Sequence, residues 1–286
     1  MAFAVFISNQ VHDGHGGAIA LDNSKIGSSH INSCLYYNDK CTYFENNRAE
    51  QDHLMGENLG GAIYAINQTE VGSADFPFKA YFKENKADHG AGIYLLNQST
   101  ANIQNSYFIS NGELGSGDTN DNSVIKVHGG GSEALIRFST FAHNSTVSVL
   151  NVEGGGVVDL RGSIVNDINP GNKVLTNDAS TFNQYCNIYH EIISVGFIVY
   201  PTIIAQDPGF VDVENSNYHL KYSSDAVDRC DLNGINEFIR TDLDGDSRAI
   251  DIPAIINGPG AYDVGADEYN DVIFSNSFEP GASSGD

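Results

Sequence analysis

Two short phrases recur together along the first half of the chain, and they constrain its fold more than any other feature. One is a Phe followed three residues later by an Asn, and it begins at Phe6, Phe44, Phe82, Phe108 and Phe141. The other is a Gly-rich step into an apolar segment, at 16–19, 60–63 and 90–93. The successive Phe residues lie 38, 38, 26 and 33 positions apart. Recurrence at this period is typical of solenoids, propellers and other repeat arrays.

Within each repeat the apolar side chains alternate, as in 61–67, and no segment before about residue 170 shows the 3.6-residue period of a helix. A propeller blade needs four strands in about 40–50 residues and usually carries a Trp-containing mark, but this chain has no Trp. The variable spacing favours a β-helix. We therefore predict an all-β fold, a right-handed parallel β-helix (solenoid), with the five Phe rings buried in one internal row and the Asn residues forming an amide ladder.

The predicted coils cover residues 1–225, beginning in the middle of a repeat, and an irregular C-terminal cap covers 226–270. Residues 271–286 are predicted to form a flexible tail. Because a solenoid contacts only neighbouring repeats, it has no fixed size limit, and 286 residues fit one such body.

The pairing of Gly-Gly-Ala-Ile with Phe-x-x-Asn over about residues 5–145 resembles the repeat signature of the polymorphic outer membrane protein family. The resemblance implies a right-handed parallel β-helix passenger domain displayed on a bacterial surface. The second half is similar to the final coils of secreted bacterial β-helix proteins, in the phrases at 207–212, 218–220, 224–228, 241–248 and 262–268. Residues 271–279 resemble a short C-terminal tail of secreted proteobacterial proteins. Neither resemblance brings a known catalytic residue.

The charge of the chain restricts its partners and its location. The formal net charge is −23, which repels phosphate backbones and anionic membrane surfaces, so we expect no nucleic-acid partner. No apolar run reaches the roughly 18 residues of a membrane span, and no signal peptide is visible in this chain. Together with the resemblance, these features predict an extracellular or outer-surface bacterial protein.

The four cysteines allow two disulfides. Cys34 and Cys41 flank a six-residue turn, and Cys186 could pair with Cys230 over a longer loop. None forms a zinc-ligand pattern. The alternative is four buried thiols. The expected extracellular location favours the disulfides.

Two carboxylate patterns are candidate sites. Asp242, Asp244 and Asp246 alternate around a Gly, as in loops that bind Ca²⁺, but the twelfth position counted from Asp242 is Pro253, so this is no EF-hand. The alternative is an Asx-rich turn with Arg248 as its counter-ion. Asp159 and Arg161 lie two apart on a predicted strand and share its outer face.

For Asp159 and Arg161, a carboxylate and an Arg on an outer groove are residue types that a polysaccharide lyase uses. The alternative is a surface ion pair.

Three histidines, His15, His89 and His128, precede Gly residues at apparently matching repeat positions. They could share a metal along one edge, although Leu59 occupies the matching place in the intervening coil. The alternative, which the interruption favours, is that they are turn histidines at the entry to a strand.

Two classes of function remain open. The first is a non-enzymatic, adhesin-like or structural passenger that recognises carbohydrate or another host or cell-surface ligand. The second is a carbohydrate-active β-helix enzyme, a polysaccharide lyase or glycosidase. No cofactor is implied beyond the candidate Ca²⁺. An enzyme should bring three or more carboxylates and a Lys or Arg together in one groove.

Overall fold

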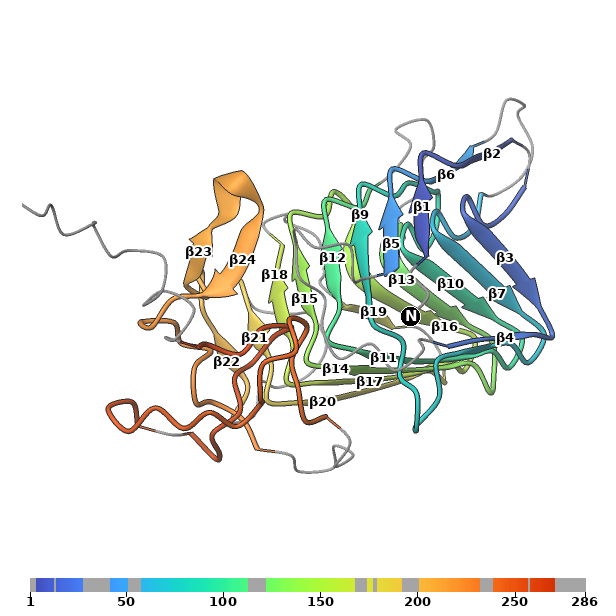
Figure 1. Ribbon diagram of the computed structural model, residues 1–286. Coiled ribbons are helices and arrows are strands. Elements are labelled where there is room, and N and C mark those ends of the chain that lie inside the picture. Colours follow the sequence, from blue (N-terminus) through green and yellow to red (C-terminus); the bar gives the residue numbers. More distant parts are fainter. Residues whose placement is uncertain are drawn as a thin grey trace, which may run out of the picture.

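A computed structural model describes the chain as a right-handed parallel β-helix, which confirms the predicted fold (Figure 1). The described residues are 4–12, 14–27, 42–50, 58–112, 122–167, 174–176, 179–191, 201–231, 239–256 and 258–270. Within these ranges the only helical element is the 3-10 turn η1 (Val213–Asn215). A search of the same residues finds no helix with the length and apolar character of a membrane span.

In the described residues, six successive coils each contribute one strand to each of three parallel sheets, and two later strands extend sheet 1. Sheet 1 contains, in spatial order, β1 (Val5–Ile7), β5 (Thr42–Glu45), β9 (Ala80–Lys83), β12 (Tyr107–Ile109), β15 (Thr140–Ala142), β18 (Ile164–Asn166), β21 (Ile188–Tyr189) and β22 (Ile203–Ile204). Sheet 2 contains β3 (Ile19–Asp22), β7 (Ile63–Ile66), β10 (Ile93–Leu96), β13 (Ser123–His128), β16 (Ser148–Glu153) and β19 (Val174–Thr176). Sheet 3 contains β4 (Lys25–Ile26), β8 (Glu70–Val71), β11 (Thr100–Gln104), β14 (Glu133–Arg137), β17 (Val157–Arg161) and β20 (Thr181–Tyr185). A short extra pair joins β2 (Gln10–His12) and β6 (Arg48–Glu50).

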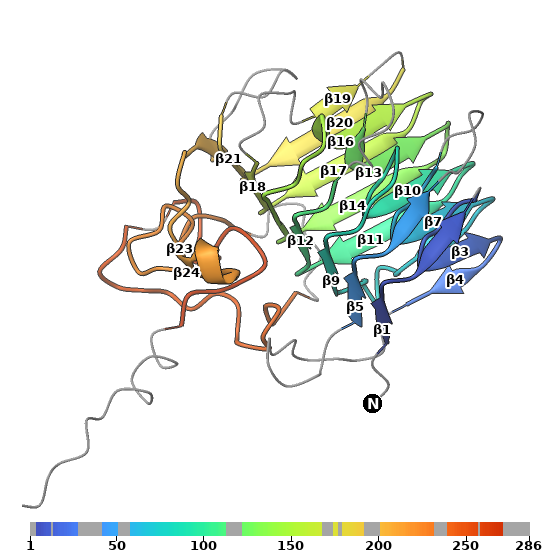
Figure 2. The ribbon, with the colours of Figure 1, turned by 90° about the horizontal axis from the view of Figure 1, so that it is seen from above.

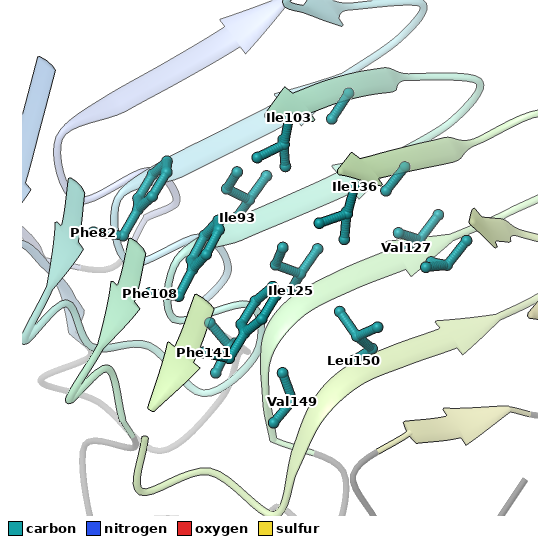
Figure 3. Packing of buried hydrophobic residues seen from close by; sticks show 14 of the residues in the cluster. Phe82, Ile93, Ile103, Phe108, Ile125, Val127, Ile136, Phe141, Val149 and Leu150 are labelled. Carbon is teal, nitrogen blue, oxygen red and sulfur yellow. The ribbon is translucent and has the colours of Figure 1, made fainter. Parts of the chain in front are cut away.

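The repeated Phe residues form the predicted internal row. They occupy equivalent positions in neighbouring strands of sheet 1, and consecutive rings stack with centroids 4.5–5.0 Å apart and planes within 8°. Figure 3 shows Phe82, Phe108 and Phe141 facing the aliphatic side chains of sheets 2 and 3. Four of the five rings are fully buried. Phe6 is the exception to the prediction: it is half-buried, because β1 is the outermost strand of the sheet and its ring stacks on one neighbour only.

The Asn residues of the same phrase form the predicted ladder. Each amide donates to the amide oxygen of the next coil, in the order Asn9, Asn47, Asn85, Asn111 and Asn144, with Nδ2–Oδ1 distances of 2.8–3.1 Å. Each of the four inner amides also donates to the carbonyl of the Phe one coil earlier, as Asn111 does to Phe82. The ladder ends on Asp167, which accepts from Asn144. Every buried amide of this ladder is thus paired, as the interior of a protein requires.

The glycine steps mark places where a side chain cannot fit. Gly60 has φ +71°, and a Cβ there would lie 2.4 Å from the carbonyl oxygen of Ile63. The following strand then alternates as predicted, with Ile63 and Ala65 in the central core and Tyr64 and Ile66 on the outer side. Backbone sterics at the glycine therefore fix the corner from which the apolar strand begins.

After the last parallel strand, β22, the chain packs against the outer face of sheet 1. An antiparallel hairpin forms from β23 (Phe210–Asp212), η1 and β24 (Asn217–Leu220), followed by irregular segments that make a second hydrophobic core with that face. Figures 1 and 2 show this C-terminal segment, in orange and red, beside β12, β15 and β18. The last parallel strand ends at Ile204. The boundary between the coils and the C-terminal cap at residue 225 stays a prediction.

The disulfide between Cys186 and Cys230 is present, with the two Cα atoms 5.9 Å apart. Cys186 follows β20 and Cys230 lies in the C-terminal segment, so the bond joins that segment to a coil. Cys34 and Cys41, and the predicted tail 271–286, lie outside the described residues.

Candidate functional site

The predicted pair on sheet 3 is part of an ion-pair cluster. Asp159 Oδ1 accepts from Arg161 Nε at 2.7 Å, and Asp159 Oδ2 accepts from Arg137 Nη2 at 3.2 Å. Arg137 also donates to the Asp159 carbonyl at 2.7 Å. Arg137 was not predicted from the sequence as part of this pair, although it aligns with Arg161 across β14 and β17. Both carboxylate oxygens are therefore engaged by arginines, and catalysis by this pair stays an unsupported prediction.

Asp242 is fully buried and caps its own turn. Its Oδ1 accepts from the backbone N–H groups of Gly245 and Asp246 at 2.8 and 2.9 Å, and its Oδ2 accepts from Glu268 N at 3.0 Å. Burial raises its pKa to about 6, and the charge of Arg248 partly offsets this. These hydrogen bonds are the ones expected of the Asx-rich turn, the alternative to a Ca²⁺ loop. Ca²⁺ at Asp242, Asp244 and Asp246 stays a prediction.

Arg248 fixes the C-terminal segment to the β-helix. Its buried guanidinium pairs with Glu268 Oε2 at 3.2 Å and donates to Asn105 Oδ1 at 2.9 Å, and it lies 4.4 Å from the ring centroid of Phe138. Asn105 and Phe138 belong to the coils, whereas Glu268 belongs to the closing phrase. The predicted counter-ion of Asp242 is therefore bonded mainly to Glu268. Nearby, Gly265 N donates to the Gly162 carbonyl at 2.8 Å, which fixes the same segment.

A cavity of about 210 Å³ lies where the hairpin approaches sheet 1. One wall is a row of Tyr43, Tyr81 and Tyr107, one from each of three consecutive coils, with ring centroids 5.4 and 5.1 Å apart. The opposite wall is the polar turn of the hairpin and its neighbours, made by Asp212, Asn215, Ser216, Asn217, Tyr218, His219, Leu243 and Asp244. The cavity therefore combines flat aromatic surface with hydrogen-bonding groups.

His219 is held at one edge of the cavity by both of its ring nitrogens. Nε2 lies 2.6 Å from Asp244 Oδ2, and Nδ1 lies 2.6 Å from Asn217 Oδ1. The Asn217 atom is an oxygen because it also accepts from the backbone N–H of His219. Burial lowers the pKa of His219, but the hydrogen bond that its ring donates to Asp244 and the charges of Asp267, Asp244 and Asp242 raise it to about 9. The ring is therefore an imidazolium at neutral pH.

The sequence analysis did not identify this cavity. Tyr43, Tyr81 and Tyr107 each precede a repeated Phe, and the strand alternation that buries the Phe turns the preceding residue outward. The outward-facing row of tyrosines could therefore be predicted from the sequence, but the hairpin that covers it could not. His89 aligns with Leu59 of the preceding coil, as the repeats predict. The matching position of His128 was wrong, because His128 aligns with Leu96 at the far end of the strand.

Comparison with known proteins identifies one repeat. Residues 42–66 match the Chlamydia polymorphic membrane protein repeat. The matched segment begins with β5, ends with β7 and contains one copy of each recurring phrase. Searches of the curated proteins and of the solved structures gave no match. The chain is a β-helix repeat protein that resembles polymorphic membrane protein passenger domains, and its matched repeat supports a passenger-like protein displayed on a bacterial surface.

Proposed function

We propose that the protein is an adhesin-like passenger that binds a carbohydrate residue in the cavity between sheet 1 and the C-terminal hairpin. The observation that carries the proposal is the row of three adjacent tyrosine rings, which lines the cavity together with amide, hydroxyl and carboxylate groups. A sugar ring has apolar C–H faces that pack on aromatic rings, and its hydroxyls hydrogen-bond to such polar groups.

The size of the cavity restricts the ligand. Pockets for drug-sized molecules measure about 300–1,000 Å³, whereas this one is about 210 Å³. A single sugar residue, such as the end of a glycan chain, matches it better than a long oligosaccharide. The acidic surface, with a net charge of −23, favours a neutral sugar over a uronate or sulfated one.

Binding has more support than catalysis. The one carboxylate predicted to act as an acid or base, Asp159, has both oxygens bonded to arginines. At the cavity, Asp244 is paired with His219, and Asp212 accepts from Asn215, whose hydrogen bonds lower the pKa of Asp212. These carboxylates are engaged in fixing the cavity wall rather than poised for proton transfer.

A glycan array followed by titration calorimetry with the best monosaccharide tests the proposal. We expect Tyr43→Ala and Asn215→Ala to weaken binding at least ten-fold. Tyr222→Ala is the matched control, because Tyr222 is 49% exposed and is absent from the cavity lining; it should bind like the unaltered protein. Equal loss in all three variants, or no glycan bound at all, would refute the site. Cleavage of the bound glycan would refute the non-enzymatic role.

A further inference from the structure

Three potential metal ligands converge beside the cavity from separate parts of the C-terminal segment. They are His219 in β24, Asp244 in the Asp-rich turn, and Asp267 in the closing phrase. One ligand atom from each lies within 4.8 Å of the others, and they are the only such group found among the described residues. His219 Nε2 lies 2.6 Å from Asp244 Oδ2 and 4.0 Å from Asp267 Oδ1.

Asp267 is the most buried of the three ligands. Asp267 is 5% exposed, and its Oδ2 accepts a hydrogen bond from the backbone N–H of Leu220 at 2.8 Å. Among the contacts made by the described residues, its Oδ1 receives no hydrogen bond and faces His219 at 4.0 Å. A buried carboxylate is costly unless a cation lies nearby, and in the absence of metal the ring of His219 supplies that charge. Arg248 does not supply that charge, because it is bonded to Glu268 and Asn105.

His219 is already oriented as a metal ligand would be. Its Nδ1 faces Asn217 Oδ1, which leaves Nε2 directed at the two carboxylates. Histidines that bind metals generally donate their other ring N–H to a fixed oxygen in this way.

The cluster can be reached from outside. His219 and Asp244 line the tyrosine-walled cavity, while His219 and Asp267 line a second cavity of about 190 Å³. An ion at the cluster would therefore lie between two open spaces and could keep a position free for water or another oxygen ligand.

We propose that His219, Asp244 and Asp267 form a binding site for a divalent transition-metal ion, with Zn²⁺ as the best fit. One imidazole nitrogen and two carboxylate oxygens are Zn²⁺ ligands, whereas Ca²⁺ takes six to eight oxygens. Zn²⁺ bonds of about 2.0–2.2 Å in a tetrahedron place ligand atoms roughly 3.3 Å apart. The two separations from His219 Nε2, 2.6 and 4.0 Å, lie on either side of that value, and all three ligand atoms lie within 4.8 Å of one another.

Binding requires Nε2 to release its proton, so one proton leaves as the ion enters. The site does not depend on the carbohydrate proposal, and either can hold without the other. It also differs from the predicted Ca²⁺ loop, which uses Asp242 and Asp246 in place of His219 and Asp267.

The test is a Zn²⁺ titration of the untagged, chelator-treated full chain, by calorimetry and by competition with a chromophoric chelator. We expect one Zn²⁺ per chain, bound at least 100-fold more weakly by His219→Gln and Asp267→Asn. Asp246→Asn is the matched control, a neighbouring carboxylate of the same turn, and it should keep the site. Co²⁺ substitution should give the visible absorption of a four-coordinate centre, and His219→Gln should abolish it.

Circular dichroism in the absence of metal shows whether each variant folds, and the partly exposed position of His219 makes its Gln variant the less disruptive one. Absence of stoichiometric Zn²⁺ binding would overturn the proposal. So would Zn²⁺ binding that His219→Gln leaves unchanged. Ca²⁺ binding lost in Asp246→Asn but kept in His219→Gln would assign the metal to the Asp-rich turn instead.

Discussion

Replacing Asn111 with Ala should remove the middle of the amide ladder and destabilise the β-helix strongly. Asn111 is fully buried, and its side chain makes four hydrogen bonds. Its Nδ2 donates to Phe82 O at 2.9 Å and to Asn144 Oδ1 at 3.1 Å, while its Oδ1 accepts from Asn85 Nδ2 at 3.0 Å and from Asn85 N at 3.1 Å.

The magnitude follows from these contacts. A net contribution of about 1 kcal/mol for each hydrogen bond gives about 4 kcal/mol. The backbone N–H of Asn85 also loses its acceptor inside the core, which adds about 1–3 kcal/mol. We therefore expect a loss of roughly 5 kcal/mol. The matched control is Asn9→Ala at the exposed end of the ladder, where a single side-chain bond to Asn47 is lost; it should cost less than about 1 kcal/mol.

Urea unfolding followed by far-ultraviolet circular dichroism measures the two losses. Because a solenoid can unfold one repeat at a time, amide hydrogen exchange at Asn85 supplies a local readout, and its protection should fall sharply in Asn111→Ala alone. If the two variants lost equal stability, or if the Asn85 amide kept its protection, the ladder would not support the coils as argued here.

Three further outcomes are expected. Phe108→Ala should cost about 3–5 kcal/mol, measured by urea unfolding, because its ring is fully buried and stacked on both sides; a loss below about 1 kcal/mol would contradict the internal row. Cys230→Ala should lower the free energy of unfolding by about 4 kcal/mol, from the loop-closure estimate for a 44-residue separation. In the unreduced protein, neither Cys186 nor Cys230 should react with a maleimide reagent. In chelator-treated protein, the contribution of His219 to stability should be full below about pH 6.5, the unfolded pKa of histidine. It should then fall as the pH rises through about 9, because the folded pKa of His219 is raised; His219→Gln should flatten this part of the melting-temperature profile, and an unchanged profile would argue against the pairing with Asp244.

The sequence alone determined the solenoid and its interior. The recurrence of Phe and Asn three positions apart fixes which side chains coincide from coil to coil, because equivalent residues stack in a parallel β-helix. The ring row from Phe44 to Phe141 and the amide ladder from Asn9 to Asn144 follow from that one rule. Such contacts join neighbouring repeats, so the period of the sequence is enough to predict them.

The candidate site was decided by the tertiary structure, because its parts come from segments without a shared period. Tyr107 and Tyr218 lie 111 positions apart and meet across the cavity. The bonds of Arg248 to Asn105, 143 positions away, fix the C-terminal segment on sheet 1. Local patterns assigned Asp244 to a calcium loop with its neighbours, whereas the fold places it against His219. No repeat rule specifies how a non-repeating segment folds back over the coils; that depends on buried contacts between distant residues, which appear only when the chain is folded.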